Sequence, residues 1–487
     1  MKMTVKKSTA ALLATSLFAF SSAAMATNGY FTHGVGTESK AMGGAGVGSS
    51  ENMGAISAAT NPALTVFSDE KWQVGLSVFS PMRSYTTSQS LANGQGGAFT
   101  LSAGKYDSKN EAFPIPYVAK NWKLGDDSAL AFIFYGRGGM NTEWDDGQSA
   151  LFDPAPGNEF SPGVINPPGV YGGGKTGVDL MQAFMSVSYA SKIGDNFSWG
   201  IGPVVAIQMF EATGLSNFAG YTQTFANVFP VYYGGCLQGG GDPDLCQLQA
   251  SGQAAEDVTS LTNNGHDSSV GYGASIGFWT GNDTLSFGLA YQTKMSMDEF
   301  ADYSDLYAES GGFDIPSTLK AGVSYKMADD LTVHVDYERI GYDEVDSVAN
   351  PIMNLLTGCY TANQQVAPAT DGCLGGPKGA GFGWDAMTVY KFGLAWNADD
   401  KNTWRFGYSF GDQPIPTTEV LFNIMAPGVM EQHFTVGWTS ERANGNVLSI
   451  ALMYAPSNEV TGTSTFDPTQ TIELEMSQLD LEFAYRF

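Results

Sequence analysis

The chain has 487 residues, with 23 lysines and arginines against 49 aspartates and glutamates, so its formal net charge is −26 at pH 7. This balance argues against a nucleic-acid partner, because phosphate groups require basic patches. Only 15% of the residues are charged, below the roughly 25% of ordinary soluble domains, while 60 glycines and 13% aromatic residues are present. A conventional soluble fold is therefore disfavoured.

A secretory signal peptide is predicted over residues 1–26. A lysine-containing n-region precedes an apolar run at residues 10–20, and Ala24-Met25-Ala26 forms an A-x-A cleavage motif. The apolar run is shorter than the about 20 residues that a transmembrane helix needs. We therefore expect an exported bacterial protein whose mature chain starts near Thr27.

The next segment, residues 27–70, is dominated by Gly, Ala, Ser, Thr and Asn and carries few large apolar side chains. Such a composition cannot bury enough apolar surface to offset its own ordering entropy. Gly43 and Gly44 allow close backbone approach and sharp bends, and Asn61-Pro62-Ala63 is typical of a turn just before a first strand. This segment cannot build a core by itself.

Beyond residue 70 the sequence alternates between apolar and polar side chains with a period of two, which predicts β-strands. In the last segment Leu479 and Leu481 lie on one face, and Asp480 and Glu482 lie on the other. Many of the expected strands exceed the roughly 9–11 residues that cross a bilayer at a tilt. The fourteen expected strands cover residues 71–90, 112–124, 128–140, 176–192, 197–213, 267–281, 283–300, 312–327, 330–343, 386–399, 401–412, 428–441, 445–460 and 471–487.

The connections between these strands alternate in length. Tight turns rich in Gly, Asn and Asp are expected at 125–128, 192–196, 281–283, 328–330, 397–402 and 441–446. Long connections are expected at 91–111, 141–175, 214–266, 301–311, 344–385, 413–427 and 461–470. Short turns at one end and long loops at the other are typical of an outer-membrane barrel, whereas a Greek-key sandwich has no reason to sort its loops in this way.

These features predict an all-β fold, a 14-stranded antiparallel transmembrane β-barrel over residues 71–487. A barrel of this width encloses a lumen that its own side chains cannot fill. We therefore interpret residues 27–70 as an N-terminal hatch, or plug, inside the lumen, with a disordered periplasmic tail as the alternative. The terminal Phe487 resembles the signal by which such barrels are handed to their insertion machinery.

Four cysteines form two local pairs in the long connections, Cys236 with Cys246 and Cys359 with Cys373. An even number in an exported chain predicts disulfides. The alternative, a zinc site, needs closer cysteine spacing and nearby histidines, which the sequence lacks. No metal and no cofactor are expected.

Several motifs resemble a known family. Gly29-Tyr30-Phe31, the AMGGAGVG run at 41–48 and the NPAL run at 61–64 resemble the amino-terminal hatch of the FadL/TodX outer-membrane transporters of long-chain fatty acids and hydrocarbons. Residues 404–416 and 422–438 resemble the carboxy-terminal region of that family. The resemblance spans nearly the whole mature chain.

The resemblance implies a transport mechanism in the bacterial outer membrane. Members of the family capture a hydrophobic compound in an outer groove between long loops and pass it to a lumenal pocket that touches the hatch. Hatch movement and a kink near the third strand then release it through the wall. Apart from the resemblance, no energy-coupling partner is needed if each transfer step is downhill in free energy. The expected partners are a hydrophobic small molecule, outer-membrane lipid and lipopolysaccharide, and a monomer is expected.

Two sets of side chains are candidates for the groove and the lateral opening. The groove is expected in the 214–266 connection, at an aromatic cluster beside a disulfide: Phe225, Phe229, Tyr232 and Tyr233. The alternative is that this cluster only packs the loop against its neighbours. The opening is expected in the third strand, where glycines could interrupt the ladder: Gly136, Gly138 and Gly139. The alternative there is a plain glycine-lined wall.

A fatty-acid carboxylate would require a cation in the lumen. Alternation places three basic residues on the inward, polar face of their strands: Lys320, Lys391 and Arg405. Arg137 is a fourth candidate, which alternation does not place. The alternative is that these cations pair with inward carboxylates, namely Asp336, Glu338, Asp480 or Glu482.

Two other classes of function are weighed against transport. An enzyme is not expected, because the four histidines are scattered over the hatch, a loop and two separate strands: His33, His266, His334 and His433. A general diffusion porin or a surface adhesin is the second alternative. A porin would lack a hatch and would conduct ions freely. The sequence leaves the substrate open among fatty acids, alkanes and aromatic hydrocarbons.

Overall fold

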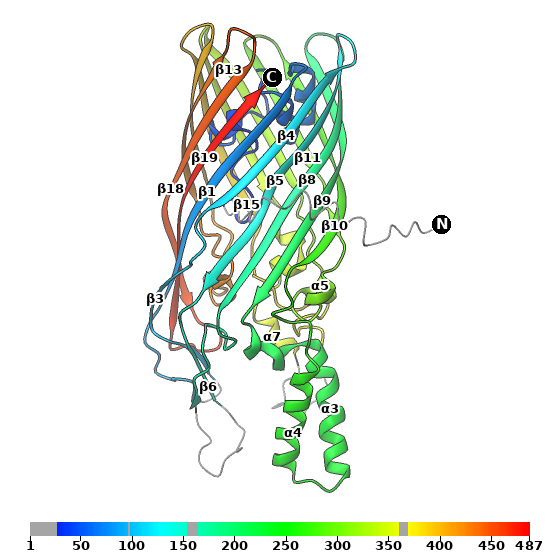
Figure 1. The fold of residues 1–487 in the computed structure, drawn as a ribbon, viewed down its shortest axis with the longest axis vertical. Coiled ribbons are helices and arrows are strands. Elements are labelled where there is room, and N and C mark those ends of the chain that lie inside the picture. The colour runs from blue at the N-terminus through cyan, green and yellow to red at the C-terminus, as the bar shows by residue number, and fades with distance from the viewer. Residues whose placement is uncertain (1–26, 96–97, 153–163, 360–368) are drawn as a thin grey trace, which may run out of the picture.

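The computed structural model describes residues 27–95, 98–152, 164–359 and 369–487. The predicted signal peptide lies outside the described residues. Within them, fourteen antiparallel strands close into a tall barrel (Figure 1). The barrel closes because the first strand pairs with the last strand on one side and with its sequence neighbour on the other. The predicted barrel architecture is confirmed.

The fourteen barrel strands agree closely with the ranges expected from alternation. They are β1 (Trp72–Thr87), β4 (Phe113–Lys123), β5 (Ser128–Trp144), β8 (Thr176–Lys192), β9 (Phe197–Thr213), β10 (Asp267–Gly281), β11 (Leu285–Gln292), β13 (Thr318–Ala328), β14 (Leu331–Ile340), β15 (Met387–Asn397), β16 (Asn402–Gly411), β17 (Gln432–Glu441), β18 (Val447–Thr463) and β19 (Thr471–Arg486).

The wall is apolar outside and polar inside. Along β19 the side chains of Leu479, Leu481 and Phe483 are 37–44% exposed, whereas Asp480 and Glu482 are at most 4% exposed. A soluble sandwich buries its apolar face, so this inverted burial identifies the outer surface as the lipid-facing one.

Two strands are shorter than expected at the end with the long loops. The expected strand 283–300 is divided, because β11 ends at Gln292 and the short β12 (Ser296–Met297) pairs with β10 in a shifted register. The expected strand 312–327 begins only at Thr318. Pro316 lies just before it, and a proline cannot donate a ladder hydrogen bond.

The connections separate the two ends of the barrel. Tight turns and the C-terminus lie at the top of Figure 1, and the long connections lie at the bottom. The long connections contain further short elements: β2 (Phe99–Leu101), β3 (Gly104–Asp107), β6 (Ser149–Phe152), β7 (Val164–Ile165), η4 (Ser216–Tyr221), η5 (Ala301–Tyr303), α5 (Ala308–Gly311), η6 (Tyr342–Glu344), α6 (Asp346–Ala349), α7 (Asn354–Gly358) and η7 (Phe422–Ile424).

The 214–266 connection, expected to be a loop, contains two helices that project from the barrel (Figure 1). They are α3 (Gln223–Gln238) and α4 (Pro243–Glu256). Thr222 caps α3 through a hydrogen bond from the backbone nitrogen of Phe225, and Asp242 caps α4 ahead of a proline at the first helical position. Both are standard helix-start signals, and the local caps outweigh the abundant glycine.

The two predicted disulfides are present in the structure. Cys236 is bonded to Cys246 between α3 and α4, and Cys359 is bonded to Cys373, with Cα–Cα distances of 5.5 and 4.5 Å. Among the described residues, no helix is long and apolar enough to cross a membrane.

The weakly apolar segment after residue 26 lies inside the barrel as the predicted hatch. Its elements are α2 (Thr37–Lys40), η1 (Ala55–Ala59) and η2 (Pro62–Phe67), drawn in blue within the upper half of the barrel in Figure 1. The Asn61 side chain donates to the carbonyls of Val47 and Phe278 and accepts from Ala63. The predicted turn therefore ties the hatch to strand β10.

Glycine is required where the hatch chain passes closest to its neighbours. Gly44 has a φ of +83°, and a Cβ atom there would lie 1.8 Å from the carbonyl oxygen of His33. Gly43 has a φ of +68° and lies against the backbone of Tyr408 in β16. Side chains at these positions would force the hatch away from the wall.

Candidate functional site

Charged side chains hold the hatch to the wall. Lys40 Nζ lies 2.7 Å from carboxylate oxygens of both Asp480 and Glu482 on β19. Burial alone would lower the pKa of Lys40, but these two carboxylates raise it above its usual value. Asp336 on β14 accepts hydrogen bonds from the backbone nitrogens of Gly46 and Val47.

Three of the four predicted cations converge on one carboxylate, that of Glu338 on β14. Lys391 Nζ lies 2.5 Å from it, Lys320 Nζ lies at 3.7 Å, and Arg137 Nη2 lies at 3.8 Å. The nearby Asp336 carboxylate is engaged by the hatch backbone. With Asp336 included, three positive side chains face two carboxylates, so the cluster has one positive charge in excess.

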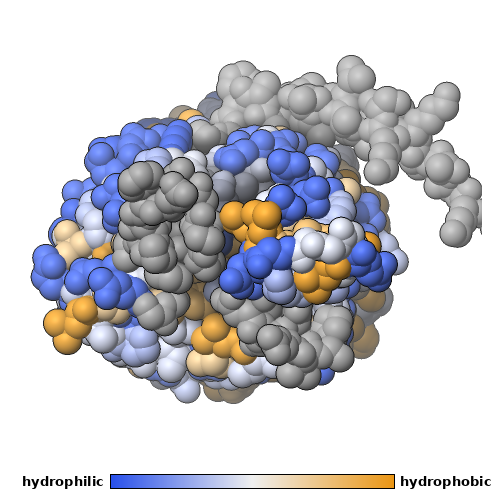
Figure 2. Space-filling view, turned by 90° about the horizontal axis from the view of Figure 1, so that it is seen from below, coloured by the Kyte–Doolittle hydropathy of each residue, from blue (hydrophilic) through white to orange (hydrophobic). Residues whose placement is uncertain are grey.

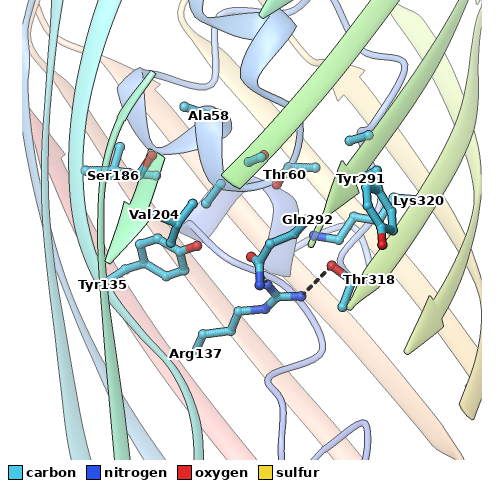
Figure 3. Close-up of a pocket in the computed structure, with 14 residues that line it drawn as sticks. Ala58, Thr60, Tyr135, Arg137, Ser186, Val204, Tyr291, Gln292, Thr318 and Lys320 are labelled. Atoms are coloured by element: carbon cyan, nitrogen blue, oxygen red, sulfur yellow. Dashed lines mark hydrogen bonds between the residues drawn. The ribbon is translucent and has the colours of Figure 1, made fainter. Parts of the chain in front are cut away.

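Arg137 and Lys320 line a small cavity between the hatch and the wall (Figure 3). The guanidinium of Arg137 donates to Gln292 and, over 3.1 Å, to Thr318 Oγ1. Tyr135, from the same strand as Arg137, encloses this space together with Val204 of β9 and Tyr291 of β11. The sequence did not predict that these residues line a cavity. With Arg137 and Lys320, they come from β5, β9, β11 and β13, which only the closed barrel brings together around the lumen.

The other two predicted cations do not line this cavity. Lys391 donates to the carbonyl oxygen of His33 in the hatch besides pairing with Glu338. Arg405 pairs with Glu51 of the hatch at 3.2 Å. Both side chains therefore anchor the hatch. Their contacts match the alternative interpretation, in which these cations pair with carboxylates. The partner of Arg405 is a hatch residue rather than one of the inward wall carboxylates.

Two buried histidines lie beside these anchors. The ring of His33 in the hatch stacks on that of His433 in β17, with centroids 5.6 Å apart. Burial, with the nearby His433 and Lys40, holds the pKa of His33 well below its usual value. His33 is therefore neutral, and it adds no charge to the interface between hatch and wall.

The glycine cluster of the third strand forms a β-bulge. The register between β5 and β8 shifts between Gly136 and Gly138. The hatch binds the strand at this point, because Thr32 donates to the Arg137 carbonyl at 2.9 Å and Gly139 donates to the Tyr30 carbonyl at 3.0 Å. A Cβ atom on Gly138 would lie 1.9 Å from Gln182 Oε1, so a larger residue there would have to displace the Gln182 side chain, which donates to Gln208.

Aromatic residues of the hatch pack against aromatic residues of the long connections, in a cluster that we call the aromatic partition. The rings of Tyr30 and Phe31 pack on Tyr342, and Tyr30 also lies 5.8 Å from the ring of Trp384. The Tyr342 hydroxyl accepts from the backbone nitrogens of Tyr30 and Phe31. The Arg137 guanidinium lies over the Phe31 ring, 4.4 Å from its centre.

An apolar cavity lies among the long connections and adjoins this partition, because its lining residue Phe382 packs against Trp384. It is lined by side chains from β8 and four loops: Val178, Leu215, Phe218, Leu306, Tyr307, Leu374, Phe382, Phe422 and Met425. Viewed from this end, hydrophobic patches lie among hydrophilic side chains (Figure 2). None of these residues was predicted, because no local pattern marks a lining assembled from separate loops.

The aromatic cluster predicted as a groove lies on α3. Phe225 and Phe229 are buried against Ala250 and Ala254 of α4. The Tyr233 ring stacks on that of Phe229, and Tyr232 is tied to Asp257 by a hydrogen bond. These contacts match the alternative interpretation, in which the aromatic cluster packs the connection against its neighbours.

A charged cluster joins three strand ends near the loops. His266 lies 3.0 Å from Asp179 and 3.1 Å from Glu211. The hydrogen bond with Asp179 raises the pKa of His266 above its usual value.

Three short stretches that were not among the predicted features match motifs of catalytic type. Residues 169–176 read GVYGGGKT, which matches the P-loop pattern, and residues 273–277 and 407–411 match G-x-S-x-G. A P-loop requires a helix after the lysine, but Thr176 begins β8; a nucleophilic serine requires a strand-to-helix turn, but both serines lie within barrel strands. The structural context of these chemistries is not present at these positions.

A family profile matches residues 157–482, and its description is "Outer membrane protein transport protein (OMPP1/FadL/TodX)". A search of curated proteins finds no match.

Solved structures with the same fold include two toluene transporters. The Pseudomonas putida toluene transporter TodX has 15% identity and a TM-score of 0.54, over 93% of this chain and 98% of that one. The Ralstonia pickettii toluene transporter TbuX has 14% identity and a TM-score of 0.52, over 93% and 98%. A Pseudomonas aeruginosa FadL homologue has 12% identity and a TM-score of 0.54, over 94% and 98%.

Proposed function

The chain belongs to the outer membrane protein transport family OMPP1/FadL/TodX, and from this premise we propose that it takes up hydrophobic compounds through its plugged barrel. The observation that carries the proposal is the aromatic partition formed by Tyr30 and Phe31. Phe382 of the apolar cavity packs against Trp384 of this partition. Arg137 of the cation-lined cavity lies over the Phe31 ring. A hydrophobic molecule therefore meets two successive sites along the lumen.

The proposed path begins at the long connections and follows the apolar surface inward. Each buried methylene contributes about 0.8 kcal/mol, so a chain of about a dozen carbons gains enough to leave water without an energy source. Release then occurs at the bulge of Gly136 and Gly138, where the hatch holds the wall through Tyr30 and Thr32. Movement of these hatch residues would free the backbone groups of β5.

The charge of the second cavity supports an anionic amphiphile, such as a long-chain fatty acid, as the substrate. Arg137 and Lys320 both line it, and Glu338 cannot neutralise both of them together with Lys391. A neutral aromatic hydrocarbon is the second candidate, because the loop-side cavity is lined almost entirely by apolar side chains and two solved relatives are described as toluene transporters.

A general diffusion porin is the main rival. Against it stands the hatch, whose described residues are largely buried inside the barrel. The test is uptake of labelled fatty acid or toluene by a host that lacks its own transporter, combined with planar-bilayer conductance. Uptake with near-silent bilayers supports the proposal, and large steady conductance without uptake overturns it.

The proposal extends to the assembly. Removal of residues 1–26 would leave a hatch of residues 27–70 within a barrel of residues 71–487. We place this unit as a monomer among outer-membrane lipid and lipopolysaccharide, because the apolar side chains of its outer face suit a lipid environment.

A further inference from the structure

A fifth inward-facing cation, which sequence reasoning did not single out, lies on the loop side of the aromatic partition. Arg83 occupies the lower part of β1, opposite Met476 of β19. It is only 5% exposed. Its position alternates with outward-facing residues of β1, so the side chain points into the lumen.

Most of the hydrogen-bonding capacity of Arg83 is unused by the protein. Nη1 donates to the carbonyl oxygen of Asn141, whereas Nε and Nη2 are buried without a protein partner. No described carboxylate forms an ion pair with this guanidinium, and its Cζ lies 5.6 Å from the ring centre of Phe113. Glu111 attracts this guanidinium only from a longer distance. A buried charge with no carboxylate in contact is costly, so the arrangement points to a ligand that supplies one.

Arg83 lines a cavity that is apolar apart from the arginine itself and Asn141. The other side chains around it include Phe79, Met140, Trp384, Met425 and Met476. Met425 also lines the larger loop-side cavity, so the two cavities adjoin. The residues around Arg83 are separate from those around Arg137 and Lys320.

The Arg83 cavity also borders the hatch. Trp384 packs against Tyr30, and Gly428 lies close to Gly29. The loop that carries Met425 is fixed to the wall, because Thr142 donates to the Met425 carbonyl at 2.8 Å. The site is therefore built from fixed elements and ends at the aromatic partition.

We infer that Arg83 is the headgroup-binding residue of a second site, which holds the carboxylate of a single-chain anionic amphiphile before it passes the hatch. The planar carboxylate matches the two unused guanidinium donors, and the tail extends past Met425 into the apolar cavity. This inference rests on the proposed function and adds a site that is upstream of Arg137 and Lys320.

The test is binding of carboxyl-¹³C-labelled dodecanoate to the full chain in a non-ionic detergent, followed by NMR. Two bound carboxylate signals are expected. Arg83→Gln should remove one of them or weaken its affinity about 10-fold or more, as expected for loss of a charge-assisted hydrogen-bonded pair. Arg137→Gln with Lys320→Gln should remove the other. Arg442→Gln, in an exposed turn, is the matched control and should keep both.

A crystal structure of the unaltered chain with 12-bromododecanoate provides a second readout that does not depend on folding of the variant. The carboxylate is expected on Arg83, with the bromine in the loop-side cavity. Absence of ligand at Arg83, or unchanged signals in Arg83→Gln, overturns the inference. Dodecanol separates the two proposals: if dodecanol binds and dodecanoate ignores Arg83, only this inference fails, and if neither ligand binds, the proposed function fails as well.

Discussion

Lys40 of the hatch and Asp480 of β19 form a buried ion pair, with Nζ 2.7 Å from Oδ2 and both side chains at most 5% exposed. Glu482 completes the pair from the next inward position of the strand. One hatch side chain thus contacts two wall carboxylates at once and joins the hatch to the wall.

Lys40→Met is expected to loosen the hatch. Removing one partner of a buried ion pair costs about 3–5 kcal/mol, and the hatch can escape that cost by leaving its seat while the barrel remains closed. Planar-bilayer recordings should then show ion-conducting openings, and residues 27–70 should become accessible to protease.

Lys105→Met is the matched control for this prediction. Lys105 also pairs with a carboxylate of β19, that of Glu475, but it is 52% exposed. An exposed pair contributes at most about 1 kcal/mol, so conductance should stay at the level of the unaltered chain. Equal effects of the two substitutions would contradict the assigned role of Lys40.

The second prediction concerns the cations of the inner cavity. Arg137→Gln combined with Lys320→Gln should weaken dodecanoate binding at the inner cavity about 10-fold to 100-fold, because charge-assisted hydrogen bonds contribute about 1.5–3 kcal/mol. Dodecanol binding should hardly change. Calorimetric titration measures both ligands. Arg339→Gln, in an exposed ion pair with Asp343, is the control, and a loss of affinity there would argue against a specific site.

The third prediction concerns the bulge in β5. Gly138→Ala places a methyl group into Gln182 and close to Phe31 of the hatch, and such overpacking costs about 1–3 kcal/mol. The variant should lose uptake and melt at a lower temperature. Gly252→Ala in α4, where a Cβ atom meets nothing within 4 Å, should transport normally. Normal uptake by Gly138→Ala would separate the bulge from transport.

The barrel was predictable from sequence because lipid outside and a polar lumen inside impose a two-residue period on every strand. Leu479, Asp480 and Leu481 show this period directly. The helices α3 and α4 were missed although Thr222 and Asp242 are strong capping residues, because glycine and proline in the same stretch suggested a loop. Local signals were present there but competed with one another.

The sites were less predictable, because they depend on barrel closure. Alternation predicted that Lys320 and Arg405 face inward, and both do. It could not predict that Lys320 meets Arg137 from the far side of the lumen, while Arg405 meets Glu51 of the hatch. Arg83 was missed because the sequence around an inward arginine does not show whether a carboxylate will lie beside it in the folded barrel.

A fourth prediction follows from the cluster of His266, Asp179 and Glu211. The carboxylates raise the pKa of His266 in the folded chain, so the stabilising charge is fully present below the unfolded pKa of about 6.5. It is lost as the pH rises through the raised folded value. Hydrogen exchange at the loop-side ends of β8, β9 and β10 should therefore be slower at pH 5.5 than at pH 8.5, after correction for the intrinsic rate.

His266→Gln should abolish this difference between the two pH values, whereas His433→Gln, in the buried wall of β17, should leave it unchanged. A pH dependence that persists in His266→Gln would assign the effect to other groups.

The fifth prediction separates the helical hairpin from the barrel. The Cys236–Cys246 bond joins α3 to α4 across 10 residues, and a bond closing a short loop of about 15 residues stabilises by about 3 kcal/mol. Cys236→Ser with Cys246→Ser should make the hairpin sensitive to protease. The melting temperature of the barrel should stay constant, because the hairpin projects beyond the wall (Figure 1). A lowered barrel melting temperature would instead show that the hairpin supports the loops around Phe218 and the apolar cavity.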